Sequence, residues 1–187
     1  MLEDVGIVGA LNNLFVSCIT NVKYRVIVNG EMSEVFRPQC GIRQGDPLSP
    51  YIFVLCMEKL SHIIHQKLHD GVWKPVKTSR GGPDIYHLFF ADDLILFGKA
   101  SLQQAIVMRE ALDLFCDLSG QQVSFPKSRI HCSRNVNGIL AKKLEDVCGS
   151  PITQNLGNYL GVPLIHGRIT RDTYNDIIVK TQKRLAS

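Results

Sequence analysis

The sequence predicts an α+β domain in which helices pack on one face of a mostly antiparallel sheet. Helix-like and strand-like segments follow one another as helix, hairpin, helix, hairpin, helix and strand, an order typical of this class. The chain has 187 residues, of which 45% are hydrophobic and 20% charged. This length and composition are sufficient for one buried core and too apolar for a disordered chain.

The N-terminal part is predicted to form a helix over residues 6–19, followed by a hairpin. A strand over residues 23–28 ends at Asn29 and Gly30, a dipeptide suited to positive φ. A second short strand through residues 35–36 closes this hairpin.

A loop over residues 40–50, with two glycines and two prolines, leads into a long predicted helix. We expect Ser49 to be its N-cap and Pro50 its first helical residue, where a missing N–H is no loss. The helix is predicted to run to residue 70. One face is predicted to be buried and holds Ile52, Phe53, Cys56, Leu60, Ile63 and Ile64. The opposite, exposed face holds Glu58, His62, His65 and His69.

The second hairpin is predicted from two apolar runs, residues 86–90 and 94–97, joined by residues 91–93. An amphipathic helix over residues 101–119 follows and ends at Gly120. Its inward side chains are predicted to be Leu102, Ala105, Ile106, Leu112, Phe115 and Cys116.

The C-terminal third is predicted to contain four further segments. They are a strand over residues 123–125, a helix over 139–147, an extended corner over 159–164 and a helix over 171–186.

Composition narrows the class of protein. No run approaches the roughly 18 apolar residues of a membrane span, and Glu3 and Asp4 stand where a secretory signal carries basic residues. We therefore expect an intracellular protein, nuclear, cytoplasmic or both, with no membrane partner. The six cysteines lack the spacings of zinc or redox motifs, which favours structural thiols.

The charge is unevenly distributed along the chain. Residues 121–187 hold 10 basic and 4 acidic side chains, whereas residues 1–120 hold 11 and 13. A basic C-terminal third fits a nucleic-acid partner, although a solvated lysine face gives the same count.

Asp92 and Asp93 stand between two apolar strands. A polar turn explains an isolated Asp-Asp pair, because aspartate favours turns. Two acids held against an apolar sheet are nevertheless costly unless a cation neutralises them. Oxygen ligands with room for water suit Mg²⁺, and nucleotidyl transfer uses two such ions.

The loop before the long helix is the second candidate element. Its glycines allow a ligand to approach the backbone closely. Arg43 can bind phosphate through two hydrogen bonds, and Gln44 can both donate to and accept from a base or sugar. The alternative is a glycine-rich loop that simply enters a core helix.

Four stretches of the sequence resemble motifs of one family. They are GIRQGDPLSPYIFVLCMEKLS (motif B), HLFFADDLILF (motif C), LSGQQVSFPKS (motif D) and NYLGVPL, the region leading to the primer grip (motif E). Together they resemble the reverse transcriptases of non-LTR (LINE-type) retrotransposons, most of all the plant elements. Group II intron and telomerase enzymes match less well, because they carry tyrosine where this chain has Phe90.

The resemblance implies an RNA-directed DNA polymerase palm that uses Mg²⁺, with Mn²⁺ as the alternative ion. Its partners would be an RNA template, a DNA primer and deoxynucleotide triphosphates. By this resemblance, the site residues and their roles are Asp92 with Asp93 as metal ligands, Phe90 and Ala91 near the primer end, Gln44 and Gly45 in the nucleotide and template pocket, Arg43 near the template backbone, and Lys127 beside the leaving pyrophosphate.

Two departures from the family qualify this expectation. Ser124 stands where the family commonly has asparagine, three residues before Lys127. No segment before Gly41 resembles motif A, which carries the family's further catalytic aspartate. The sequence therefore predicts a partial palm over residues 1–168, without the motif A strand and the upstream fingers segment, and the start of a thumb or connection region over 169–187. Such a chain is expected to polymerise little or nothing alone. The alternative is a non-catalytic retroelement relic that only binds nucleic acid.

The remaining candidates are weaker. The exposed histidine face could bind a transition metal, but a solvated surface explains it better. His87 is expected to be a satisfied core or edge histidine. Trp73, with Lys74 and Lys77, is expected to anchor a loop, and stacking on a base is the alternative.

Overall fold

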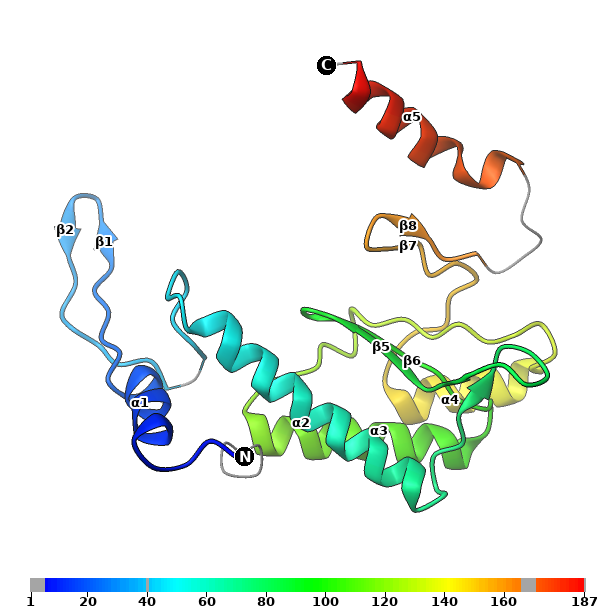
Figure 1. The fold of residues 1–187 in the computed structure, drawn as a ribbon, viewed down its shortest axis with the longest axis horizontal. Helices are drawn as coiled ribbons and strands as arrows, with labels where there is room; N and C mark the ends of the chain where they lie inside the picture. Colours follow the sequence, from blue (N-terminus) through cyan, green and yellow to red (C-terminus); the bar gives the residue numbers. More distant parts are fainter. Residues whose placement is uncertain (1–5, 40, 166–170, 187) are drawn as a thin grey trace.

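The computed structural model describes residues 6–39, 41–165 and 171–186. The elements follow one another in this order: α1 (Gly9–Thr20), β1 (Ile27–Val28), β2 (Glu31–Met32), α2 (Ser49–His69), β3 (Val76–Lys77), β4 (Asp84–Ile85), β5 (His87–Phe90), β6 (Asp93–Leu96), α3 (Leu102–Ser119), α4 (Gly138–Cys148), β7 (Asn158–Tyr159), β8 (Val162–Pro163), the short 3₁₀ helix η2 (Arg171–Tyr174) and α5 (Asn175–Leu185). This mixture of helices and small antiparallel sheets agrees with the predicted α+β class (Figure 1).

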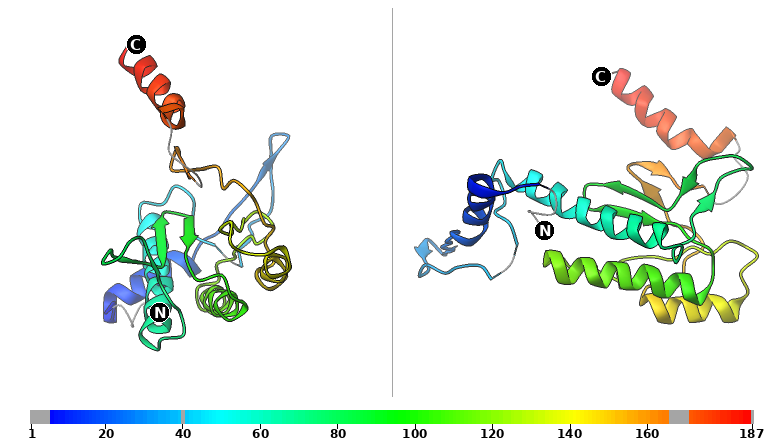
Figure 2. Two further views of the ribbon diagram at one scale, coloured as in Figure 1. Left: turned by 90° about the vertical axis from the view of Figure 1, so that its right-hand side faces the viewer. Right: turned by 60° about the horizontal axis from the view of Figure 1, so that its bottom comes forward.

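The core lies between α2 and α3, which run side by side, and α4 packs against α3 (Figures 1 and 2). Its fully packed members come from both helices and from the segment after α2: Leu60, Ile63, Ile64, Trp73, Val107, Ala111 and Phe115. The Trp73 indole N–H donates to the Phe97 carbonyl at 3.0 Å and so ties the end of the β5–β6 hairpin to this core. Trp73 is 1% exposed, so the expected loop anchor is confirmed and stacking on a base is wrong.

The β5–β6 hairpin lies against the core through one face. Phe89 pairs with Leu94, and both side chains, with Leu96, pack on the core cluster. Leu88 and Phe90 alternate with them and are exposed. Because side chains alternate across a strand, one face of the hairpin is buried against the core and the other, the open face, is exposed.

The prediction of one mostly antiparallel sheet is wrong for the part of the chain that the structure describes. The strands form four separate two-stranded antiparallel sheets. Each strand has only two to four residues. Helices and loops separate the hairpins, except that Tyr86 alone separates β4 from β5. An isolated parallel bridge joins Ile130 to Ile152.

The N-terminal elements largely confirm the local prediction. Helix α1 occupies Gly9–Thr20, close to the predicted helix. Asn29 and Gly30 form the turn with φ of 51° and 86°, as the dipeptide predicts. The strands are shorter than predicted, although the Tyr24–Phe36 bridge extends the pairing.

Helix α2 ends where predicted, but its first turn differs. Leu48 is the N-cap and Ser49 is already helical. The Ser49 hydroxyl donates to the Arg43 carbonyl, while Asp46 Oδ1 accepts from the Leu48 N–H at 2.9 Å. No described side chain caps the first turn of α2, so the N-cap predicted for Ser49 is wrong, and Asp46 instead holds the turn before the helix. The predicted buried face is confirmed, except that Phe53 is half-buried.

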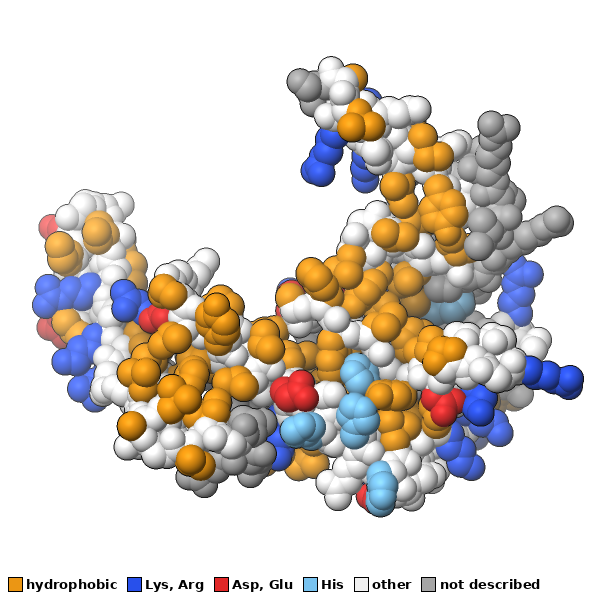
Figure 3. Space-filling model, in the orientation of Figure 1, with side chains coloured by type: hydrophobic (Ala, Val, Ile, Leu, Met, Phe, Trp, Pro, Cys, Tyr) orange, Lys and Arg blue, Asp and Glu red, His pale blue; other side chains and the backbone are white. Residues whose placement is uncertain are grey.

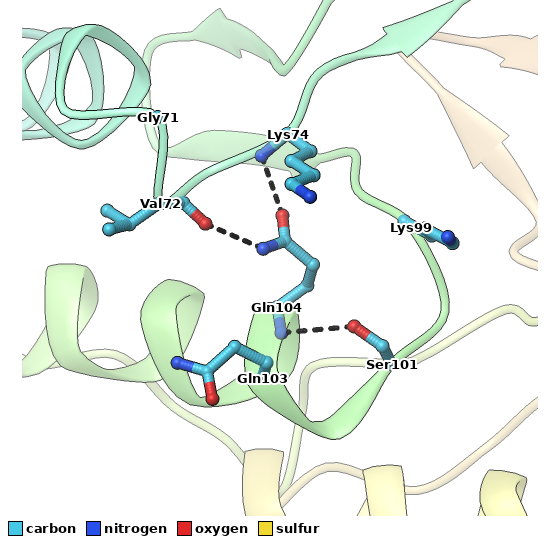
Figure 4. A pocket seen from close by; sticks show the side chains of 7 residues that line it. All are labelled: Gly71, Val72, Lys74, Lys99, Ser101, Gln103 and Gln104. Carbon is cyan, nitrogen blue, oxygen red and sulfur yellow. Dashed lines mark hydrogen bonds between the residues drawn. The ribbon is translucent and has the colours of Figure 1, made fainter.

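Helix α3 has the predicted ends, with a rotated buried face. Gly120 ends it at φ 69°, and the Ser101 side chain caps its start. Ile106 is exposed, whereas Gln104 is buried because its amide accepts from the Lys74 N–H at 2.7 Å and donates to the Val72 carbonyl at 2.6 Å (Figure 4). Its buried members are Gln104, Ala105, Val107, Ala111 and Phe115. Leu102, Leu112 and Cys116 are only half-buried.

The C-terminal part contains one wrong prediction. No strand forms over residues 123–125; a turn over 124–128 takes its place, because the Lys127 and Ser128 N–H groups both donate to the Ser124 carbonyl at 3.0 Å. The helix over 139–147 is confirmed as α4. The corner over 159–164 is the β7–β8 hairpin, and the predicted tail helix corresponds to η2 and α5. Among the described helices, none combines the length and apolarity needed to cross a membrane.

Candidate active site at the β5–β6 turn

The two carboxylates stand at the closed end of the β5–β6 hairpin. Phe90 pairs with Asp93, so Ala91 and Asp92 are the two residues of the turn itself. Ala91 has φ 48°, a left-handed conformation that residues other than glycine seldom adopt. Asp92 therefore lies at the tip, and the backbone around it is held in a strained conformation of the kind found at functional sites.

Asp93 and Phe90 share the open face of the hairpin. Directly paired residues point to the same side of a sheet, and Leu88 lies on that side as well. Phe90 is 59% exposed. An aromatic ring and a carboxylate therefore stand next to each other and beside Asp92, on the face turned away from the core.

The donor set is suited to a hard cation but is small. Asp92 and Asp93 are both exposed, with room for water around their oxygens. Carboxylate oxygens with water are the usual protein ligands of Mg²⁺. Within the described ranges, no three His, Cys, Asp or Glu side chains are grouped to hold a metal ion.

The loop before α2 is ordered by its own hydrogen bonds. The Asp46 N–H donates to the Arg43 carbonyl at 3.4 Å, and the Ser49 N–H donates to the Asp46 carbonyl at 3.1 Å. Gly45 has φ 81°, which permits the sharp turn. Arg43, Gln44 and Gly45 are exposed, so this folded loop presents them to solvent.

The topology brings two of the predicted motifs, the 41–48 loop and the β5–β6 turn, to one end of the core. The N-terminal end of α2, the turn of the β5–β6 hairpin and the C-terminal end of α3 all face this end, in Figure 1 and in the right-hand view of Figure 2. The 41–48 loop leads into α2 at this end. The segment after α3 runs back along that helix, because Phe125, two residues before Lys127, lies against Arg109 in its first half. No hydrogen bond or ion pair of the described residues joins Arg43 or Gln44 to Asp92.

Lys127 lies exposed in the 124–128 turn. This turn is attached to the body of the domain through Phe125, whose ring lies under the Arg109 guanidinium at 3.8 Å. The sequence reasoning missed Arg109. The only local signal was its spacing from Asp113, four residues on, which predicts a helical ion pair.

The histidine face of α2 is exposed, as predicted for a solvated surface, and Figure 3 shows histidine side chains gathered on this side of the core. His65 Nε2 forms a hydrogen bond with Tyr86 Oη at 2.8 Å, and His65 Nδ1 lies 2.9 Å from the Ser61 carbonyl oxygen. His87 differs from its prediction, because its Nδ1 is buried without a hydrogen-bond partner. Burial, and then the nearby His65, lower the pKa of His87, while Glu58 opposes this shift.

The described cysteines are free thiols with structural surroundings. Cys56 is buried and Cys18, Cys116, Cys132 and Cys148 are half-buried. Burial raises the pKa of the thiols of Cys56, Cys132 and Cys148, which makes them poor nucleophiles.

Comparison with known proteins identifies the family to which this chain belongs. The family described as reverse transcriptase (RNA-dependent DNA polymerase) matches residues 7–164. The chain therefore belongs to the reverse transcriptase family.

Individual relatives include the polyproteins of two retrotransposable elements. The chain is 30% identical over 99 residues to the Retrovirus-related Pol polyprotein from type-2 retrotransposable element R2DM of Drosophila melanogaster. It is 31% identical over 95 residues to the Retrovirus-related Pol polyprotein from type-1 retrotransposable element R2 of Popillia japonica. It is also 45% identical over 67 residues to an uncharacterized mitochondrial protein of Arabidopsis thaliana. These matches confirm the predicted reverse transcriptase domain of the non-LTR type.

The similar regions cover unequal shares of the proteins. They span 53%, 51% and 36% of this chain for the fly, beetle and plant relatives. They span 8% and 15% of the two polyproteins and 55% of the plant protein.

Proposed function

We propose that this chain forms part of the polymerase site of an RNA-directed DNA polymerase, which adds deoxynucleotides to a primer 3′ end on an RNA template. The observation that carries the proposal is Asp92 at the strained tip of a hairpin docked on the α2–α3 core. In the reaction, the primer 3′ oxygen loses its proton to solvent and bonds to the α-phosphorus. The bond from that phosphorus to the bridging oxygen breaks, and pyrophosphate leaves.

Each predicted residue has a role in this proposal. Asp92, with Asp93 beside it, would hold Mg²⁺ or Mn²⁺, which when bound supplies positive charge that stabilises the negative charge developing on the phosphoryl oxygens. Phe90 and Ala91 border the primer end on the open face of the hairpin. Lys127 donates a proton to the departing pyrophosphate.

The loop before α2 positions the template and the nucleotide. Arg43 binds a backbone phosphate through its planar fork of N–H groups. Gln44 and Gly45 border the base pair. Gly45 has no side chain and so leaves room there, and its positive φ disfavours any other residue at this position. The 169–187 region is proposed as the start of the thumb or connection region, in which α5 carries Lys183 and Arg184 in its last turn.

The test is primer extension on an RNA template with Mg²⁺. The chain is assayed beside a version joined to an upstream polymerase segment that carries the motif A aspartate, each also as Asp92→Ala. We expect the joined version to extend primers. The chain by itself should show little extension, because two-ion catalysis needs a further carboxylate besides the adjacent pair in the β5–β6 turn. Asp92→Ala should lower the rate by roughly 10²-fold or more, equivalent to several kcal/mol of transition-state stabilisation.

The matched control is Asp84→Ala, which removes another exposed hairpin carboxylate, one in β4 whose Oδ1 is 4.0 Å from Lys77 Nζ. It should leave extension unchanged. If no version extends primers but all bind RNA–DNA hybrid with strong salt dependence, the alternative of a non-catalytic relic replaces the polymerase proposal.

A further inference from the structure

The turn that carries Lys127 is closed locally by its own hydrogen bonds. The N–H groups of Lys127 and Ser128 both donate to the Ser124 carbonyl at 3.0 Å. The Ser128 hydroxyl donates to the same carbonyl at 3.0 Å. These bonds fix the shape of the turn, but they do not fix where it lies on the domain.

Its position is set on one side by the backbone of Ile130, whose N–H donates to the Pro151 carbonyl at 3.0 Å and whose carbonyl accepts from the Thr153 N–H at 2.8 Å. On the other side it is set by two contacts that meet at Phe125, two residues before Lys127. The Arg109 guanidinium carbon lies 3.8 Å from the centre of the Phe125 ring. The Ser150 hydroxyl donates to the Phe125 carbonyl at 2.9 Å, and Ser150 is only 3% exposed. The ring and the carbonyl of one residue are therefore held from two sides, by α3 and by the segment after α4.

Arg109 is itself held in place. Its Nε lies 2.9 Å from both carboxylate oxygens of Asp113, to which it donates, and one terminal nitrogen donates to the Cys148 carbonyl at 3.2 Å. A planar guanidinium with both ends engaged has little freedom to rotate. Gly149 accommodates it, because a Cβ there would lie 3.2 Å from the guanidinium.

We propose that Arg109 is a positioning residue for nucleotide addition: it fixes, through the Phe125 ring, the turn that carries Lys127. This inference rests on the proposed function, in which Lys127 protonates the leaving pyrophosphate. A purely structural role, in which Arg109 only joins α3 to the end of α4, is the competing explanation.

The first test measures amide hydrogen exchange in this chain. Arg109→Ala should raise exchange at the Ile130 amide, which donates to the Pro151 carbonyl at 3.0 Å, by roughly tenfold, because the segment that carries the turn loses its ring contact while the α2–α3 core stays closed. The matched control is Lys67→Ala, which removes the other ion pair of α3, from Lys67 to Glu110 at 3.2 Å. It should leave exchange at the Ile130 amide unchanged. Unchanged exchange in Arg109→Ala as well would overturn the inference.

The second test is a double-mutant cycle in the version joined to the upstream segment. Lys127→Ala should lower kcat by roughly a hundredfold. Arg109→Ala should lower kcat by roughly tenfold, because the lysine is present but poorly placed. In the Lys127→Ala background, Arg109→Ala should have almost no further effect. The KM for the RNA–DNA hybrid should not change.

Further variants separate positioning from stability. Phe125→Tyr retains the ring and should retain kcat, whereas Phe125→Leu should resemble Arg109→Ala.

The outcomes distinguish the two proposals. Extension activity with additive effects of Arg109→Ala and Lys127→Ala overturns the positioning role and leaves the proposed function intact. No extension by any version, with RNA–DNA hybrid still bound, refutes the proposed function and the positioning role with it.

Discussion

The two hairpins β1–β2 and β5–β6 have similar turns but differ in how much of their surface is buried. Both close through two residues, and both place a non-glycine residue at positive φ, Asn29 in one and Ala91 in the other. All residues of the β1–β2 strands are exposed, whereas β5–β6 buries one face against α2 and α3. The difference teaches that a turn is specified by its own residues, while docking depends on partners far away in the chain.

The apolar content of the first hairpin sharpens this contrast. Ile27 is 67% exposed and Met32 is 67% exposed. Full burial of an apolar side chain stabilises a fold by about 1.5–3 kcal/mol. Because Ile27 and Met32 are exposed among the described residues, they contribute little of this stabilisation. We therefore expect mutations in the two regions to have very different effects on stability.

The largest expected difference comes from truncation of a core side chain. Trp73→Ala should lower the free energy of unfolding by about 3–5 kcal/mol, because it opens a cavity and leaves the Phe97 carbonyl without its donor. Ile27→Ala should change it by less than about 0.5 kcal/mol. Urea denaturation followed by far-UV circular dichroism measures both. Similar losses in the two variants would show that the first hairpin is packed after all.

The turns themselves give an intermediate effect. Ala91→Gly should raise the free energy of unfolding by up to about 1 kcal/mol, because glycine adopts the left-handed conformation without a Cβ clash and this turn is coupled to the core. Gly30→Ala introduces strain at φ 86°, but an undocked hairpin relieves it by opening locally.

The checks are global denaturation and local amide exchange. For Gly30→Ala we expect faster exchange in β1 and β2 with an unchanged denaturation midpoint. A lower midpoint would contradict the comparison, since it would couple the first hairpin to the core.

The smallest expected effect is the contribution of His87, in β5, to the pH dependence of the free energy of unfolding. The pKa of His87 is lowered in the folded protein by burial, with a smaller contribution from His65 against the opposing Glu58. The unfolded chain therefore binds a proton first, near the ordinary histidine pKa of about 6.5. The stability that the neutral ring contributes is complete above that pKa and is lost as the pH falls below it, through the lowered pKa of the folded state.

The test compares variants by denaturation between about pH 7 and pH 5. His87→Leu should lose less stability over this range than the native chain does. His69→Leu is the control, since its side chain is 91% exposed, and it should lose as much as the native chain. An identical slope in His87→Leu and the native chain would remove His87 as the cause.

The sequence could predict the features that neighbouring residues decide. The helical periods, the turn at Asn29 and Gly30, the stop at Gly120 and the place of Asp92 between two strands all depend on local chemistry. The N-cap predicted at Ser49 is wrong, because the Ser49 hydroxyl donates to the Arg43 carbonyl of the preceding loop, a contact that the local residue pattern does not indicate.

Features decided by distant contacts could not be predicted. Gln104 is buried because its side chain forms hydrogen bonds with the backbone of Val72 and Lys74, which lie about 30 residues earlier in the chain. The single sheet was expected from strand signals alone, which do not say which strands meet. Within the candidate site, the motifs gave Asp92 and Lys127, but only the fold placed Arg109 over Phe125.

Trp73 has a consequence for how this molecule can be observed. It is the one tryptophan of the chain, and it is buried where α2, α3 and the end of the β5–β6 hairpin meet. Indole emission shifts to longer wavelengths when water reaches the ring. Intrinsic fluorescence therefore reports the opening of this single junction and is silent about the first hairpin, so the emission follows the packing that supports the β5–β6 hairpin rather than the chain as a whole.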